Sequence, residues 1–166
     1  RILLAEAAGL ATEDASGATR PCLLTAEDLA GWRPTFEAPA TRTYRGHRVF
    51  KCGPWSQGPV FLQQLALLER FEPWAARPDA VAGHRWSEAH KLAFADREAW
   101  YGDPDFADVP LDALLSDAYA RRREIGAKAS MEARPGRPDG RDPGLLPWFP
   151  GPGGEGAAAK IAAGVA

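Results

Sequence analysis

The clearest hydrophobic pattern in the chain starts at Ser56 and has the spacing of a helix. Its apolar stripe is formed by Phe61, Leu65 and Leu68, with Leu62 on the flank. Intervals of three and four residues place apolar side chains on one face of an amphipathic helix. Ser56 can accept a hydrogen bond from a free N–H of the first turn, and Pro59 falls where a missing N–H loses no bond. We therefore expect this helix to bury one face.

A second helical pattern begins at Arg85 or Ser87 and should stop at Gly102. The residues that share its inner face are Trp86, Ala89, His90, Ala93, Arg97 and Trp100. The sequence that follows, Asp103-Pro104-Asp105-Phe106, predicts a turn, because Asp can bond its own backbone and Pro fixes φ.

A third helix is expected from Leu111 to about Ile125, ended by Gly126. Its apolar side consists of Leu111, Leu114, Leu115 and Tyr119. From Arg134 onward, Pro and Gly break the pattern until an Ala-rich tail starts at Ala157. This last part is expected to be loosely ordered.

The first third of the chain has weaker patterns. Ile2 to Ala11 is rich in Ala and Leu and predicts a helix, and Ala15 to Pro21 predicts a loop. Thr25 can cap a short helix that Trp32-Arg33-Pro34 ends. Polar and apolar residues then mix from Thr35 to Cys52, which is compatible with a β-hairpin turning at Arg45-Gly46.

The expected fold is mainly α with one short β-hairpin. The expected segments are an N-terminal helix and loop at residues 1–24, a helical domain with the hairpin at 25–133, and a Pro/Gly-rich linker with an Ala-rich tail at 134–166. At 166 residues with 45% apolar content, the chain can bury one modest core.

Charge and hydropathy exclude several partner classes. A net charge of -2 argues against nucleic acid, and Arg121-Arg122-Arg123 is interpreted as a solvated run near a helix end. No apolar run approaches the ~20 residues of a membrane span. Because the chain opens at Arg1 without Met, we expect it to be a fragment, which leaves the compartment open between cytoplasmic and periplasmic or secreted.

Other residues with potential chemistry have plainer explanations. Cys22 and Cys52 are expected to be free thiols, with one bridge as the alternative. His47, His84 and His90 lack the four-residue helical spacing that would place two imidazoles on one metal. His90 is interpreted as a hydrogen-bonded interior or interface residue.

Two carboxylate motifs and one Gly-rich run are also interpreted structurally. Arg97 beside Asp96 should bond carboxylates or helix-end carbonyls, and Asp103 with Asp105 should fix the turn. The run Gly151–Gly156 matches G-x-G-x-x-G, but Leu145–Pro150 before it is no central strand, so a linker is favoured. We therefore assign no catalytic, cofactor-binding or metal-binding residue in this chain.

Four motifs in uninterrupted order nevertheless resemble the large subunit of γ-glutamyltransferases. They are LLTAEDLAGWRP at 23–34, YRGHRVF at 44–50, SQGPVFLQQLALLERF at 56–71 and AHKLAFADREAWYGDPDFADVPLDALLS at 89–116. The resemblance extends through Tyr119 and weakly to Arg134-Pro135-Gly136. Its most specific part is AFADR followed by YGDPDF.

The resemblance implies an N-terminal-nucleophile hydrolase of αββα fold, made as a precursor that cuts itself into two subunits. In that family a Thr at the new N-terminus of the small subunit attacks a γ-glutamyl amide, and no cofactor is implied. The last Thr of this sequence is Thr43, before the matching helices, so the nucleophile is expected on a small subunit outside this chain. The expected partners are that subunit and the remainder of the large one.

One departure and two alternatives qualify this expectation. The family's usual Pro-rich Ser-Ser-Gly-Gly lead-in to the central helix is replaced by Cys52–Pro59, a form that resembles amidohydrolases of the oxamate amidohydrolase type. An acylase of the same superfamily is therefore an alternative to a glutathione-type enzyme. A stand-alone helical interaction module is the other, and the encoding reading frame separates it from an enzyme.

Self-association is the testable consequence of an excised helical piece. Its two apolar faces, Phe61 with Leu65 and Leu68, and Trp86 with Ala93 and Trp100, cannot both be covered internally, so we expect the purified chain to self-associate. Light scattering over a concentration series measures this. A species that stays monomeric at high concentration would contradict it.

Overall fold

The computed structural model describes residues 2–13, 17–71, 79–131 and 134–143. Two compact units divide the chain, one formed by residues 1–36 with 148–166 and the other by residues 37–147. The Gly-rich run at 151–156 and the Ala-rich tail lie outside the described residues. Among the described residues, no helix is both long and apolar enough to cross a membrane.

The first unit contains a small hairpin that the sequence pattern did not predict. Helix α1 spans Ile2–Ala8 rather than continuing to Ala11, because the chain passes into strand β1, Ala11–Glu13. Strand β2, Thr19–Pro21, pairs antiparallel with β1, where a loop was predicted. Gly17 precedes β2 with φ of 83°, a conformation that suits Gly, and Thr12 supplies a β-branched residue.

Helix α2, Ala26–Gly31, has the predicted cap. The Asp28 N–H donates to Thr25 Oγ1 at 3.1 Å, and the Thr25 N–H donates back to Asp28 Oδ2 at 2.8 Å. This is a capping box with Asp in the acidic position. The helix ends at Trp32, as predicted.

The predicted hairpin is confirmed in the second unit. Strands β3, Ala40–Tyr44, and β4, His47–Lys51, pair antiparallel with Tyr44 opposite His47. Arg45 and Gly46 form the turn with φ of 48° and 82°. Positive φ at both turn residues is typical of the two-residue turns whose twist matches the strands.

Helix α3, Gly58–Leu68, begins as predicted but buries a different face. Ser56 Oγ accepts the Gly58 N–H at 3.0 Å, which supports the helix start. Leu68 of the predicted stripe is buried, but Phe61 is 43% exposed and Leu62, which was placed on the flank, is fully buried, so the centre of the buried face was wrong. The buried residues are Pro59, Val60, Leu62, Gln63, Gln64, Ala66, Leu67 and Leu68.

Helix α4, Ala80–Trp100, starts earlier than predicted. Asp79 caps it by accepting the Ala82 N–H at 2.8 Å, a local signal that the apolar pattern beginning at Arg85 overlooked. The helix ends before Gly102, as expected. Ala89 and Ala93 on the predicted face are buried, but Trp86 is 57% exposed.

The predicted third helix is broken into two. Helix α5 spans Leu111–Leu114 and α6 spans Asp117–Arg122, so helical structure ends before Ile125 and Gly126. Ser116 causes the break, because its Oγ accepts the Tyr119 N–H at 3.1 Å and caps a new helix. An apolar period alone does not reveal such an internal cap.

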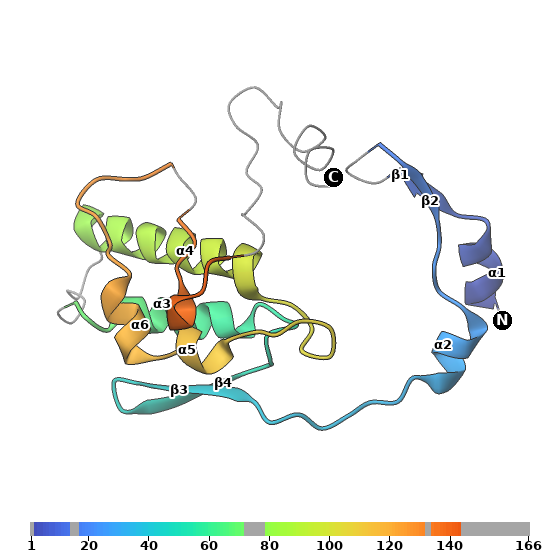
Figure 1. The fold of residues 1–166 in the computed structure, drawn as a ribbon, viewed down its shortest axis with the longest axis horizontal. Helices are drawn as coiled ribbons and strands as arrows, with labels where there is room; N and C mark the ends of the chain where they lie inside the picture. Colours follow the sequence, from blue (N-terminus) through green and yellow to red (C-terminus); the bar gives the residue numbers. More distant parts are fainter. Residues whose placement is uncertain (1, 14–16, 72–78, 132–133, 144–166) are drawn as a thin grey trace. The chain divides into compact units, whose positions relative to one another are not determined.

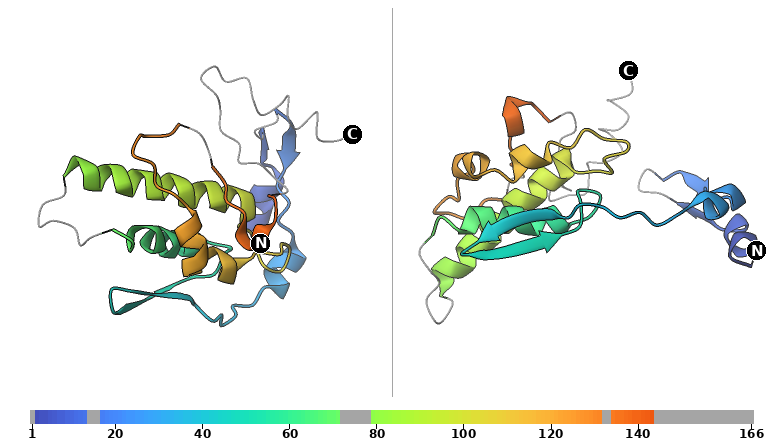
Figure 2. Two further views of the ribbon diagram at one scale, coloured as in Figure 1. Left: turned by 60° about the vertical axis from the view of Figure 1, so that its left-hand side comes forward. Right: turned by 90° about the horizontal axis from the view of Figure 1, so that it is seen from below.

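Helix α3 is the central element of the second unit. It packs against α4 on one side and against the β3–β4 hairpin on another (Figure 1). Helix α6 also contacts α3, as two further views show (Figure 2). The apolar cluster between these helices consists of Ala66, Leu67, Leu68, Ala89, Leu92 and Ala120, with Phe71 and Ile125 packed against it.

Two glycines provide a matched test of this packing. A Cβ on Gly58 would lie 2.6 Å from the backbone oxygen of Cys52, so Gly58→Ala should lower the free energy of unfolding by about 1–3 kcal/mol. A Cβ on Gly83, inside α4, would meet nothing within 4 Å, so Gly83→Ala should raise it by about 0.5–1 kcal/mol. Denaturant unfolding measures both, and effects of the same sign would contradict the packing described.

Candidate functional site

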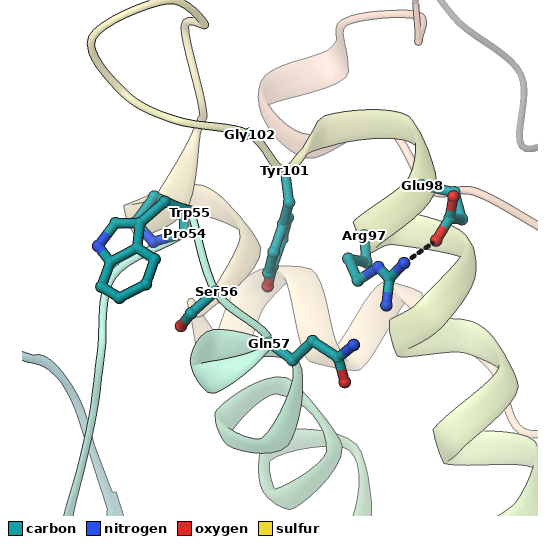
Figure 3. A pocket seen from close by; sticks show the side chains of 8 residues that line it. All are labelled: Pro54, Trp55, Ser56, Gln57, Arg97, Glu98, Tyr101 and Gly102. Carbon is teal, nitrogen blue, oxygen red and sulfur yellow. Dashed lines mark ion pairs between the residues drawn. The ribbon is translucent and has the colours of Figure 1, made fainter. Parts of the chain in front are cut away.

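A pocket of about 340 Å³ lies where the start of α3 meets the end of α4. It is lined by Pro54, Trp55, Ser56, Gln57, Arg97, Glu98, Tyr101 and Gly102 (Figure 3). The first four residues belong to the lead-in to α3, where the sequence has its unusual motif. The other four lie in the last turn of α4 and directly after it. Segments from two of the motifs that carry the resemblance therefore form one concave surface.

The lead-in turn is held by its own hydrogen bonds. Trp55 Nε1 donates to Glu37 Oε2 at 2.7 Å, which fixes the indole at the rim. Ser56 Oγ donates to the Gly53 carbonyl at 2.8 Å while accepting the Gly58 N–H. The Ser56 hydroxyl therefore serves the turn and the helix start.

The opposite wall carries an ion pair and a phenol. Arg97 Nη2 lies 2.6 Å from Glu98 Oε1, and its guanidinium lies 5.2 Å from the Phe94 ring centroid. Figure 3 shows the Tyr101 side chain between Arg97 and the lead-in turn. Burial, with the nearby charge of Asp96, raises the pKa of Tyr101, so its hydroxyl stays a donor.

Tyr101 connects the pocket to a buried carboxylate. Its hydroxyl donates to Gln63 Oε1 at 3.2 Å, and Gln63 Nε2 donates to Asp96 Oδ2. Asp96 is fully buried. Its other donors are the Tyr119 hydroxyl at 2.9 Å, Arg123 Nη2 at 3.1 Å and the Gly136 N–H at 2.5 Å.

Burial raises the pKa of Asp96, and the Arg123 charge and the hydrogen bonds oppose that rise. Four donors converge on this carboxylate from three other parts of the chain: α3, the α6 region and the segment after it. A buried carboxylate is tolerated when it is paired and hydrogen-bonded in this way. Asp96 therefore links these segments beneath the pocket.

Glu88 is a second fully buried acid on α4. Lys91 pairs with Glu88 Oε1, and the Ser130 N–H donates to the same oxygen at 3.3 Å. Arg134 Nη2 lies 3.4 Å from Glu88 Oε2. Both buried acids of α4 thus hold chain that follows α6.

A smaller hollow of about 250 Å³ surrounds Arg42 of β3. Arg42 Nη2 contacts Glu69 Oε2 at 2.8 Å and Asp117 Oδ1 at 2.7 Å, and Nη1 donates to the Leu115 carbonyl at 3.1 Å. The Arg42 hydrogen bond and charge lower the pKa of Asp117. This cluster ties the hairpin to the end of α3 and the start of α6.

His84 and His90 make separate contacts, and His47 lies in another element. His84 Nε2 lies 2.7 Å from the Gly126 carbonyl, and His90 Nδ1 lies 2.9 Å from Gln64 Nε2. His90 has the expected hydrogen bond, but the side chain is exposed, so its placement in the interior was wrong. His47 starts β4. Within the described ranges, no group of three His, Cys, Asp or Glu residues could hold a metal ion.

The predicted turn is confirmed, and the basic run needs a correction. The Asp105 N–H donates to Asp103 Oδ1 at 3.0 Å, which closes the turn. The prediction that Arg123 is solvated was wrong, because its side chain is only 12% exposed and binds Asp96. Cys22 and Cys52 are exposed free thiols.

Sequence reasoning missed the residues that surround Asp96. They are Gln63, Tyr101, Tyr119, Arg123 and Gly136. A usable signal did exist, since Asp96 lies four residues after Leu92 and three after Ala93 on the buried stripe of α4. An acid on an apolar stripe requires donors from the elements packed against it.

Comparison with known proteins links this chain to one family. The family model described as Gamma-glutamyltranspeptidase matches residues 9–144. The glutathione hydrolase proenzyme of Escherichia coli is 39% identical over 122 residues, which cover 69% of this chain and 21% of that protein. The chain thus spans about a fifth of the length of this relative.

Solved structures with a similar fold also belong to longer chains. LmbA2991HD superposes with a TM-score of 0.70 at 53% identity, covering 82% of this chain and 23% of that one. A cephalosporin acylase from Bacillus halodurans superposes with a TM-score of 0.63 at 42% identity, covering 69% and 22%. The described fold is therefore also found within longer chains, one of which is a cephalosporin acylase.

Replacement of Arg123 tests the contacts of the buried carboxylate. Arg123→Met leaves Asp96 without its charged partner, and we expect the free energy of unfolding to fall by about 3–5 kcal/mol. Arg122→Met, on the neighbouring exposed side chain, is the matched control and should change it by less than about 0.5 kcal/mol. Denaturant unfolding measures both, and equal effects would contradict the role of Arg123.

Proposed function

This chain belongs to the gamma-glutamyltranspeptidase family, and on that premise we propose that it forms part of the large subunit of an N-terminal-nucleophile amidohydrolase. In this proposal the chain is the helical, non-catalytic scaffold of a precursor that is cut into a large and a small subunit. Proenzyme is the word used for the Escherichia coli relative, which supports a precursor.

The observation that carries the proposal is the family match together with the position of the threonines. The match covers residues 9–144, and the last Thr, Thr43, precedes every helix of the second unit. A Thr nucleophile that follows these helices must therefore belong to a part of the precursor outside this sequence. The serine hydroxyl among the pocket-lining residues, Ser56 Oγ, is hydrogen-bonded to the Gly53 carbonyl and the Gly58 N–H.

The proposed reaction is acyl transfer from a γ-glutamyl amide. The N-terminal Thr of the small subunit attacks the amide carbonyl, its own amine acts as base, and the acyl group passes to water or to an acceptor amine. This chain contributes to the reaction by holding the large subunit in shape. The pocket between α3 and α4 is a surface against which other parts of the enzyme or a substrate can pack.

A second candidate is an acylase or amidohydrolase that acts on a non-glutamyl amide. Two observations favour it: the Cys52–Pro59 lead-in departs from the glutathione-type form, and the Bacillus halodurans cephalosporin acylase is 42% identical. Residues of this lead-in form part of the pocket wall, where Trp55 stands at the rim. Substrate choice is therefore the point at which the two candidates differ.

Activity measurements on the whole enzyme and on this chain test the proposal. We expect the complete precursor, after cleavage, to hydrolyse γ-glutamyl anilide, and the purified 166-residue chain to release no anilide above the buffer rate. Turnover by the purified chain would contradict the scaffold assignment. A panel of γ-glutamyl anilide, oxamate and a cephalosporin side-chain amide on the complete enzyme separates the two candidates.

A further inference from the structure

Residues 134–141, here called the return segment, have little regular secondary structure but many contacts with the helices. Their one regular element is a 3-10 turn, Pro138–Gly140. Gly136 and Pro138 are nevertheless buried. Irregular backbone is usually exposed, because buried peptide groups need partners.

Gly136 is fixed from three directions. Its N–H donates to Asp96 Oδ1 at 2.5 Å, and its carbonyl accepts Trp100 Nε1 at 2.9 Å. A Cβ at this position would lie 1.9 Å from the Tyr119 hydroxyl oxygen, so only Gly fits. Both polar backbone groups of Gly136 are therefore bound by side chains of α4.

Further contacts hold both ends of the return segment. Arg123 donates to the Arg134 carbonyl, and the Arg134 guanidinium reaches Glu88. At the other end, Arg141 Nη1 bonds Asp108 Oδ2 at 2.7 Å, and its guanidinium lies 5.7 Å from the Trp100 ring centroid. The backbone is thus held on both sides of Gly136.

The apolar core does not account for these contacts of the return segment. The hydrophobic cluster is built from α3, α4 and α6, with Phe71 and Ile125 against it. The buried carboxylates of Asp96 and Glu88 instead bind the return segment, Asp96 through the Gly136 N–H and Glu88 through the Arg134 guanidinium. The arrangement holds residues 134–141 against α4.

We propose that the contact between Asp96 and Gly136 positions the precursor for self-cleavage, by setting the path of the chain that continues toward the small subunit. The inference rests on the function proposed above. The cleavage is a hydrolysis: the peptide bond before the new N-terminus breaks, and water supplies OH to the new carboxyl group and H to the new amine. Asp96 is a positioning residue here, since it acts through Gly136.

The test compares cleavage rates of complete precursors. Gly136→Ala forces the segment away from Tyr119, and we expect the cleavage rate of folded precursor to fall at least ten-fold, since a displacement near 1 Å can cost about 10²-fold. Freshly synthesised precursor is followed by gel electrophoresis over time. Circular dichroism under the same conditions gives the folded fraction, to which each rate is normalised.

Two controls separate positioning from stability. Leu62→Ala opens a cavity in the core at a residue outside the return segment, and its normalised cleavage rate should stay within two-fold of wild type. Arg137→Gln removes the exposed ion pair between Arg137, inside the segment, and Asp142, which follows it, and should also leave the rate within two-fold. Equal slowing by Gly136→Ala and Leu62→Ala would overturn the inference, and so would a Gly136→Ala rate equal to wild type.

A milder variant covers the case in which Gly136→Ala does not fold. Trp100→Phe keeps an aromatic ring but removes the Nε1 donor to the Gly136 carbonyl, and we expect cleavage to slow several-fold. An unchanged rate for this folded variant would overturn the inference. A wild-type precursor that remains uncut overturns the proposed function itself, and the inference falls with it.

Discussion

The second unit depends on one buried carboxylate, that of Asp96. Burying a charge is unfavourable by several kcal/mol unless hydrogen bonds and an opposite charge replace the lost water. Gln63, Arg123 and Gly136 supply those partners from α3, the end of α6 and the return segment. The position of each segment is therefore specified by polar geometry as well as by apolar contact. Such contacts penalise alternative packings, because any shift leaves Asp96 short of a partner.

Several of the apolar residues around this network are alanines, which makes the polar contacts more important. Ala66, Ala89 and Ala93 lie in the buried layer of α3 and α4 and let these helices approach closely. Alanine buries little area, so the layer offers limited free energy to choose among registers. Asp96 and Glu88, eight residues apart on α4, add two points where register matters. The chain combines a modest core with polar contacts that select one arrangement.

Local signals made part of this fold predictable, and long-range contacts made the rest unpredictable. The Arg45-Gly46 turn and the Ser56 support of α3 are encoded within a few residues, so both were found. The break at Ser116 lies inside a continuous apolar pattern, which masks it. The site is harder, because Gln63 and Gly136 lie 33 and 40 residues from Asp96. Periodicity can flag an acid on an apolar stripe, but it cannot say which donors reach it.

The motif that carries the family resemblance makes structural contacts in this chain. In AFADR and YGDPDF, Asp96 anchors buried donors, Tyr101 bonds Gln63, and Asp103 closes the turn through the Asp105 N–H. Each of these contacts stabilises the fold. The lead-in to α3 differs in this respect, since Ser56 keeps its structural bonds while Trp55 stands at the rim of the pocket. Neighbouring positions thus have different contacts, Ser56 at the helix start and Trp55 at the pocket rim, and the family match by itself does not identify a substrate.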